Sequence, residues 1–403
     1  MRRLSTASGL CVLVLVAGCA AVAWPHASRL VPRNGGHPVG DELWSWLYLG
    51  FAIAAFVAYG AGLWLLRRFG GRVALVVAVA VAIQLAPLGG PLLLSTDAWT
   101  YWDYGRIAAV HGGNPYVQHP QDFPADPAYR YAGDGWRDTS SVYGPAFTLV
   151  SEPLALADDA SADAAAWTYK ALAAAAMAAI VLLVWRLTRS PYAVAFVGWN
   201  PLLALHFAGG GHNDAWMAAF VLGALALAAS GRRQLAGVAW ALAILVKWVP
   251  LLFLVLRAVE ARGRRSVAHL GFAATVASVL GLATWRYGLH WLGAVGPLAR
   301  NANKETYFAI PHRLGALGVA SPHVWAFVLG AAFALAYLWL LWEARCGRVR
   351  LGLCAGLLLL ATPWLVAWYA VWAVPLAAVD DDRPAQLLAL GLSAYLLRQA
   401  VPL

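Results

Sequence analysis

The sequence predicts an all-α, polytopic membrane protein, and three observations support this. The 403 residues are 62% hydrophobic and only 12% charged, with a mean hydropathy of +0.65, whereas about a quarter of the residues in soluble domains are charged. Apolar runs close to or above the roughly 18 residues that suggest a membrane span recur along the chain. Arginines gather in the short segments between these runs. We therefore predict a helical bundle of about 11–13 transmembrane helices, a count limited by short and broken helices.

The net charge and the cysteines exclude two other classes of protein. A formal charge of +10 would suggest a nucleic-acid partner in a soluble chain, but arginines beside membrane spans set orientation instead, and we expect no nucleic acid. The four cysteines lack metal-site spacing and predict neither disulfides nor zinc. Val16–Cys19 resembles a lipoprotein cleavage box, but the apolar run continues to Trp24, which favours an uncleaved first helix.

Placing the arginine clusters on the cytoplasmic side predicts the path of the chain. The expected single spans cover residues 8–24, 46–66, 73–93, 164–187, 191–207, 214–230, 267–287, 323–343 and 384–400. Residues 234–258 lie between two arginine clusters, the second running from Arg257 through Arg265. One helix cannot start and finish on the same side, so two short helices meeting at Lys247–Pro250 are expected, where the proline disfavours helix. A second broken pair is expected at Thr362-Pro363-Trp364.

Two polar segments are predicted to lie outside the membrane, within one integral membrane domain covering residues 1–403. The first, 94–163, is rich in Asp and Tyr and is the longest break in the apolar chain. Irregular polar chain belongs in water or inside protein, not in lipid. The first segment is therefore the expected catalytic loop. The second segment, 288–320, carries several polar residues, among them Arg300, Asn301, Asn303, Lys304 and Glu305.

Side chains in and near these loops indicate glycosyl transfer. Asp97 follows a helix exit, next to Thr96 and several aromatic residues, and a carboxylate there is placed to accept a proton from a hydroxyl group. Aromatic faces suit sugar rings, while guanidinium groups or a buried ammonium group suit a phosphate. Together these groups are typical of sugar transfer from a lipid-linked phosphosugar.

Several short motifs follow one another from about residue 95 to 376. They are Asp97-x-x-x-Tyr101, Gly105-Arg106, Gly113-Asn114-Pro115-Tyr116, Ser141-Val142-Tyr143-Gly144-Pro145, Trp199-Asn200-Pro201-Leu202 with His206, Gly209-Gly210-Gly211-His212-Asn213-Asp214, the Lys247 hairpin and Pro363-Trp364…Trp368-Tyr369…Trp372…Pro375. In this order, the chain resembles the polyprenol-phosphate-mannose-dependent mannosyltransferases of actinobacterial envelopes. The segment before residue 95 matches them only in hydropathy.

The resemblance implies a GT-C fold, a multi-span helical bundle with a large first outer loop. It also implies an inverting transfer that needs no metal or other cofactor. The acceptor hydroxyl would lose its proton to Asp97 and attack the anomeric carbon as the lipid phosphate leaves; Asp103 is the second candidate base. Six helical residues turn through about 600°, so we do not expect the two acids to form a dyad. The structural alternative for Asp97 is a helix cap.

Other residues are candidates for binding the donor and its phosphate. They are Lys247, His212, Asn213, Asp214, Arg106, His312 and Arg313. An intramembrane charge is costly without a partner, which favours Lys247 as a phosphate ligand; its alternative role is an ion pair with Asp214. His212–Asp214 begins a helix, and such a terminus either binds an anion or is simply capped. The arginines and His312 would otherwise be solvated loop charges.

Aromatic and amide side chains are the candidates for contacts with the sugar and the acceptor. They are Tyr101, Asn114, Tyr116, Tyr143, Trp364 and Tyr369. Trp364, Trp368 and Trp372 recur every four residues, which predicts a stripe along one helix, a pattern more typical of packing or of a membrane interface than of a sugar platform.

Three functions remain open from the sequence. The leading one is transfer of mannose from a polyprenyl-phosphate donor to a cell-envelope glycolipid or glycan. The second is the same chemistry with another sugar, such as arabinofuranose or glucose, and the third is transport of a lipid-linked glycan by a flippase. Charges gathered on one face favour the enzyme, because alternating access needs sites near the midplane. We expect a multi-pass protein of the bacterial plasma membrane, embedded in the lipid bilayer, whose active site is extracytoplasmic.

Overall fold

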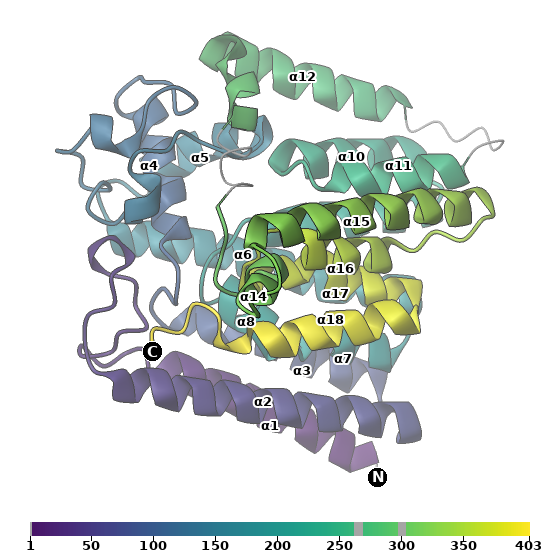
Figure 1. The fold of residues 1–403 in the computed structure, drawn as a ribbon. Coiled ribbons are helices and arrows are strands. Elements are labelled where there is room, and N and C mark those ends of the chain that lie inside the picture. Colours follow the sequence, from purple (N-terminus) through teal and green to yellow (C-terminus); the bar gives the residue numbers. More distant parts are fainter. Residues whose placement is uncertain (1, 262–268, 297–303) are drawn as a thin grey trace.

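A computed structural model describes residues 2–261, 269–296 and 304–403, which are predominantly helical (Figure 1). Its α-helices in chain order are α1 (Arg2–Ala21), α2 (Glu42–Phe69), α3 (Val73–Leu85), α4 (Asp97–Ala109), α5 (Pro145–Ala157), α6 (Ala162–Thr188), α7 (Pro191–Gly198), α8 (Pro201–Phe207), α9 (Asp214–Ala229), α10 (Arg233–Val246), α11 (Pro250–Glu260), α12 (His269–Tyr287), α14 (Ile310–Gly315), α15 (Pro322–Arg345), α16 (Leu351–Ala361), α17 (Ala370–Asp380) and α18 (Arg383–Tyr395). Across the described residues there is no β-strand, only an isolated bridge between Ser28 and Asp41.

Some predicted features fall outside this part of the chain. Residues 262–265 of the second arginine cluster lie outside the described residues. So do Arg300, Asn301 and Asn303 of the expected second outer loop.

Four described helices are long and apolar enough to cross a membrane. They are Leu4–Ala21 within α1, all of α2, α6 and α15. Among the shorter apolar helices, α9 and α17 pack beside α6, α16 packs beside α15, and α10 packs against α9. The chain is therefore a helical membrane protein, while the number of about 11–13 spans stays a prediction.

Short polar residues determine where several of the long helices begin. Asp41 precedes α2 and accepts a hydrogen bond from the Leu43 amide at 2.8 Å, and Ser161 does the same for α6. These side chains satisfy amide groups that the first helical turn leaves without partners. Arg67 and Arg68 end α2, where positive charge is favourable at the C-terminal end of a helix.

The predicted break at Lys247 is present. Helix α10 ends at Val246, Lys247 has extended backbone, and Pro250 begins α11. The second predicted break is longer than expected, because α16 ends at Ala361 and residues 362–366 are non-helical before the 3₁₀ helix η6 (Ala367–Tyr369).

Two expected spans are interrupted where the sequence predicted continuous helices. The span 191–207 is split into α7 and α8, since Pro201 begins a new helix and Asn200 caps it through the Leu202 amide at 3.1 Å. The span 73–93 leaves the α conformation at Leu85 and continues as the 3₁₀ helix η2 (Ala86–Gly89). A proline lies at each interruption, Pro201 at the start of α8 and Pro87 in η2. Proline lacks the backbone N–H group that a continuing α-helix needs.

Helices α4 and α5 lie with the 110–144 segment at one end of the bundle, opposite the end that carries the N-terminus (Figure 1). A hydrogen bond connects this segment to α4, because the Tyr104 hydroxyl donates to the Thr139 carbonyl at 2.7 Å. Gly105 allows α4 and α5 to approach closely, because a Cβ there would collide with the Ser151 carbonyl. The segment that the sequence predicted as the first outer loop is thus a folded cap.

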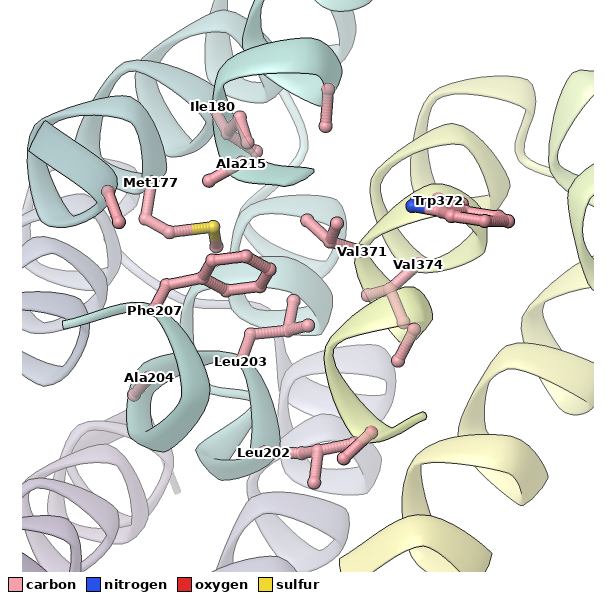
Figure 2. Close-up of a cluster of buried hydrophobic side chains, with 14 of the residues drawn as sticks. Met177, Ile180, Leu202, Leu203, Ala204, Phe207, Ala215, Val371, Trp372 and Val374 are labelled. Atoms are coloured by element: carbon pink, nitrogen blue, oxygen red, sulfur yellow. The ribbon is translucent and has the colours of Figure 1, made fainter. Parts of the chain in front are cut away.

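Below this cap, apolar side chains from helices far apart in the sequence form the core (Figure 2). The cluster contains Met177 and Ile180 of α6, Leu202, Leu203, Ala204 and Phe207 of α8, Ala215 of α9, and Val371, Trp372 and Val374 of α17. Close packing here fixes the starts of α9 and α17 relative to each other. The start of α9 carries Asp214, and the first turn of α17 carries Trp372.

Candidate active site

A cavity of about 400 Å³ lies where the cap meets the bundle. Three segments line most of it: residues 94–97 with Tyr101 and Tyr143 from the cap, the hairpin tip at Lys247 and Trp248, and part of 362–372. None of the three is adjacent to another in sequence, so folding alone brings them together. Five sequence-predicted site residues line this cavity besides Asp97, and they are Tyr101, Tyr143, Lys247, Trp364 and Tyr369.

Asp97 is the first residue of α4 and is 8% exposed. Its carboxylate Oδ2 accepts a hydrogen bond from the Tyr101 hydroxyl at 3.4 Å and lies 3.1 Å from His212 Nδ1. Thr96, not Asp97, is the N-cap residue of this helix. The negative charge is nevertheless favoured by its place in the first helical turn.

His212 is fully buried behind Asp97. Its ring stacks on Trp368 at 3.7 Å between centroids, with 12° between the planes. Gly211 precedes it with φ +73°, a backbone conformation that side-chain-bearing residues rarely adopt. The stacking and this turn hold the imidazole with Nδ1 toward the carboxylate.

Lys247 connects the hairpin tip to α9. Its ammonium Nζ lies 2.7 Å from Asp214 Oδ1, and it also stands 4.8 Å from the Tyr369 ring centroid and 5.5 Å from that of Trp372. Trp372 Nε1 donates to the same Asp214 oxygen at 2.6 Å. The Asp214 side chain is fully buried, whereas that of Lys247 is 18% exposed and lines the cavity.

Aromatic rings form much of the remaining surface. Tyr101 packs edge-on against Tyr143 at 5.0 Å, and Tyr369 stacks on Trp372 at 4.0 Å. Burial, together with the neighbouring Tyr143 and Asp97, raises the pKa of Tyr101 well above its ordinary value, so its hydroxyl is a neutral donor. The cavity thus combines one carboxylate, one ammonium group and flat apolar faces.

The tryptophan stripe is not formed by one helix, which corrects the sequence prediction. Trp364 lies in the non-helical segment after α16, Trp368 in η6 and Trp372 in α17. All three line the cavity. The non-helical backbone after Pro363 changes the direction of the chain, so a spacing of four residues does not correspond here to one helix face.

Asp103 lies on the same helix as Asp97 but does not line the cavity. It is buried inside the cap. Burial, reinforced by Asp126 and opposed by Arg106 and Arg137, raises its pKa to about 7. The helical rotation between the two acids therefore separates them, and only Asp97 faces the cavity.

Several other predicted residues support the cap instead of facing the cavity. Arg106 Nε donates to Asp126 at 2.8 Å, and its Nη1 donates to the Asp159 carbonyl at 2.7 Å. Asn114 donates to the Tyr287 carbonyl at 2.8 Å, and the Tyr116 hydroxyl donates to the Tyr143 carbonyl at 3.1 Å. Tyr116 therefore does not line the cavity but bonds the backbone of Tyr143, which does.

His312 and Arg313 also lie outside the cavity lining. His312 Nδ1 is 3.3 Å from Glu305, and Arg313 stands over the Tyr307 ring at 4.8 Å. Their segment supports the third wall, because the Thr306 amide donates to the Pro363 carbonyl. Asn213 is buried next to His212, and among the described residues its side-chain amide has no hydrogen-bond partner.

Some lining residues were not among the predicted site residues. They are Pro32, Gly36, Trp136, Trp248, Trp368 and Trp372, with Leu94 and Val366. Trp368 and Trp372 carried a sequence signal in their spacing, which indicated packing. Trp136 and the segment at Pro32 carried none, since neither belongs to a chemical motif.

A fold of apolar helices with this cavity fits the class of membrane glycosyltransferases, and sequence comparison identifies the family. The family described as alpha-(1->6)-mannopyranosyltransferase, N-terminal domain, matches residues 6–262. The chain belongs to this family, and it is a mannosyltransferase that requires a sugar donor and a glycan acceptor. Part of the cavity wall, at 362–372, lies beyond the matched residues.

One curated relative extends the likeness over most of the chain. Alpha-(1->6)-mannopyranosyltransferase A of Mycobacterium tuberculosis is 26% identical over 399 aligned residues, which cover 89% of this chain and 73% of the relative. No solved structure matches the chain.

The raised pKa of Asp103 predicts a pH dependence of stability. Below about pH 4 the carboxyl group is protonated in both the folded and the unfolded chain. As the pH rises from 4 toward 7, Asp103 ionises in the unfolded chain but stays protonated in the folded one. The free energy of unfolding therefore falls by roughly 1.4 kcal/mol per pH unit in this window. We expect Asp103→Asn to remove this loss. Thermal unfolding in detergent at pH 5, 6, 7 and 8 measures it as the difference between parent and variant.

Asp138→Asn is the matched control, because Asp138 is an exposed carboxylate of the same cap. It should keep the pH slope of the parent. An Asp103→Asn variant whose unfolding temperature still follows the parent across this range would contradict the assignment.

Proposed function

We propose that the protein transfers mannose from a polyprenyl-phosphate donor to a cell-envelope glycolipid or glycan, with inversion at the anomeric carbon. The architecture would be of the GT-C type, multi-pass in the bacterial plasma membrane, with the cavity on the extracytoplasmic side. One observation carries the proposal, which is that Asp97, Lys247 and a set of aromatic rings line the same cavity. Family membership supports the sugar.

Lys247 is the proposed ligand of the donor phosphate. Its pairing with Asp214 keeps a positive charge stable at the hairpin tip, and its partial exposure leaves donor capacity toward the cavity. An ammonium group has three protons to donate, so one bond to Asp214 leaves others for phosphate oxygens. The stacked Tyr369 and Trp372 rings beside it offer an apolar face for the mannose ring.

Asp97 is the proposed general base. The two side chains that contact its carboxylate, His212 and Tyr101, both meet Oδ2, which leaves Oδ1 to accept a proton from the acceptor hydroxyl. As that proton moves to Asp97, the acceptor oxygen forms a bond to the anomeric carbon, and the bond from that carbon to the phosphate oxygen breaks. The phosphate leaves with the electron pair, and Lys247 stabilises its charge.

His212 is the proposed positioning residue for this base. With Nδ1 protonated it donates to Asp97, and its stacking on Trp368 fixes the direction of that bond. An oriented carboxylate loses less entropy on reaching the reactive geometry.

Substituting the proposed base tests the reaction. We expect Asp97→Asn to lower the transfer rate about 10²–10⁴-fold, because the variant cannot accept the proton, while donor binding persists. The measurement is transfer from polyprenyl-phosphate mannose to a short mannoside acceptor by purified protein in nanodiscs. The exposed-cap variant Asp138→Asn should transfer at the parental rate. Undiminished transfer by Asp97→Asn would remove this residue as the base.

Lys247 is tested against its structural role by a paired substitution. Lys247→Met alone leaves the Asp214 carboxylate buried without its cation, which is destabilising, so Lys247→Met/Asp214→Asn is the informative variant. We expect the double variant to regain thermal stability but to keep a donor KM raised about tenfold or more, since a charge-assisted bond to phosphate is lost. Recovery of the parental KM would instead make the ion pair purely structural. Lys304→Gln is the matched control.

The proposed mechanism needs no divalent cation. Among the residues that the structure describes, no group of three or more His, Cys, Asp and Glu side chains is placed to hold a metal ion. We expect the transfer rate to be unchanged by excess chelator, because Lys247 alone would meet the phosphate charge. Loss of activity that manganese or magnesium restores would contradict a metal-free mechanism.

A further inference from the structure

A second cavity of about 710 Å³ lies beside the first. It is bordered by the ends of three helical segments: Trp24 follows α1, residues 88–92 include and follow the end of η2, and Trp167 and Lys170 lie in the first turns of α6. Two of these helices, α1 and α6, are candidate membrane spans. The cavity therefore opens at the level where membrane helices end.

Its rim has the composition of a membrane–water interface. Trp24 is 65% exposed and Trp167 is 59% exposed, and both line the cavity. Tryptophan is enriched at the headgroup level of bilayers, where its ring is apolar and its N–H group is polar. Two exposed indoles bordering one cavity therefore indicate contact with lipid.

More positively than negatively charged side chains line this cavity. Arg33, Arg130 and Lys170 line it together with one carboxylate, Asp163. Lys170 is occupied, since its ammonium bonds the carbonyls of Leu88, Gly90 and Pro91. It serves to hold the cavity wall.

Both arginines keep donor capacity. Arg33 contacts the His26 ring at 3.3 Å, and Arg130 donates to the Tyr131 hydroxyl at 2.8 Å. Neither arginine forms an ion pair with a carboxylate within residues 2–261, 269–296 and 304–403. A guanidinium group has five donors, so both retain N–H groups for an anion.

The two cavities share two segments of their walls. Along residues 31–36, Val31 and Arg33 face the second cavity while Pro32 and Gly36 face the first. The first turns of α4 are divided in the same way, with Trp99 facing the second cavity and Asp97 the first. Residues 31–36 and the first turn of α4 therefore border both cavities.

We propose that the second cavity binds the phosphate headgroup of an anionic lipid, with Arg33 and Arg130 donating to the phosphate oxygens and the acyl chains leaving past Trp24 and Trp167. Planar guanidinium forks match phosphate oxygens in geometry as well as in charge. The indoles border the apolar part of the lipid. Assigning this lipid to the outer leaflet rests on the proposed orientation of the enzyme, whereas headgroup binding itself does not.

Native mass spectrometry of the full-length protein in nonionic detergent tests the proposal. The probes are phosphatidylglycerol and phosphatidylcholine with the same acyl chains. We expect the parent to bind phosphatidylglycerol about tenfold more tightly, since only this lipid carries net negative charge for the two arginines. Arg33→Gln/Arg130→Gln should lose the preference, and Arg33→Lys/Arg130→Lys should keep most of it.

The control variant is Arg345→Gln/Lys304→Gln, which removes two exposed positive charges that line neither cavity. It should bind phosphatidylglycerol as the parent does. Equal loss in this control, or an unchanged preference in Arg33→Gln/Arg130→Gln, would overturn the proposal. Displacement of the lipid by millimolar inorganic phosphate would assign the site to free phosphate instead. The assay needs neither sugar donor nor acceptor, so its failure is separate from a failure of the mannosyl-transfer proposal.

Discussion

The buried carboxylate of Asp214 is the group on which the cavity depends. It lies at the start of α9, and it binds Lys247 of the hairpin tip and the indole of Trp372 in α17. Three segments separated by long stretches of chain thus meet at one oxygen atom. A buried charge that loses its partner is strongly destabilising. The Asp214 carboxylate therefore depends on the Lys247 ammonium group and the Trp372 indole for its stability in the folded protein. The ion pair connects these segments, and the exposed part of Lys247 faces the cavity.

Asp97 also connects segments that are far apart in the sequence. The His212 ring that contacts the carboxylate is itself held by Trp368, a residue of η6. Consequently Asp97 connects the cap to the start of α9 and to the 362–372 wall, whereas Asp214 connects the start of α9 to that wall and to the hairpin tip. The carboxylate that faces the cavity and the one that lies behind it are thus both held by residues of the 362–372 wall, Asp97 through His212 and Trp368 and Asp214 through Trp372.

The sequence predicted those parts of the fold that follow from local physical limits. The hairpin at Lys247 was required because two arginine clusters stand too close for one span, and the separation of Asp97 from Asp103 follows from helical rotation. The tryptophan stripe was wrong because Pro363 ends regular helix before Trp364. The partners of Arg106 could not be foreseen, since Asp126 and Asp159 are reached only after the cap folds. Trp136 carried no motif at all.

The position of the third cavity wall near the end of the chain has a consequence for biogenesis. The cap, His212 and the Lys247 hairpin are synthesised early, but residues 362–372 follow only after α15 and α16. Until then Lys247 has Asp214 as a partner but lacks the Tyr369 and Trp372 rings, and His212 lacks the ring on which it stacks. The nascent chain therefore has two walls of the cavity before the third, and the cavity is complete only after residues 362–372 have been synthesised and folded against the rest.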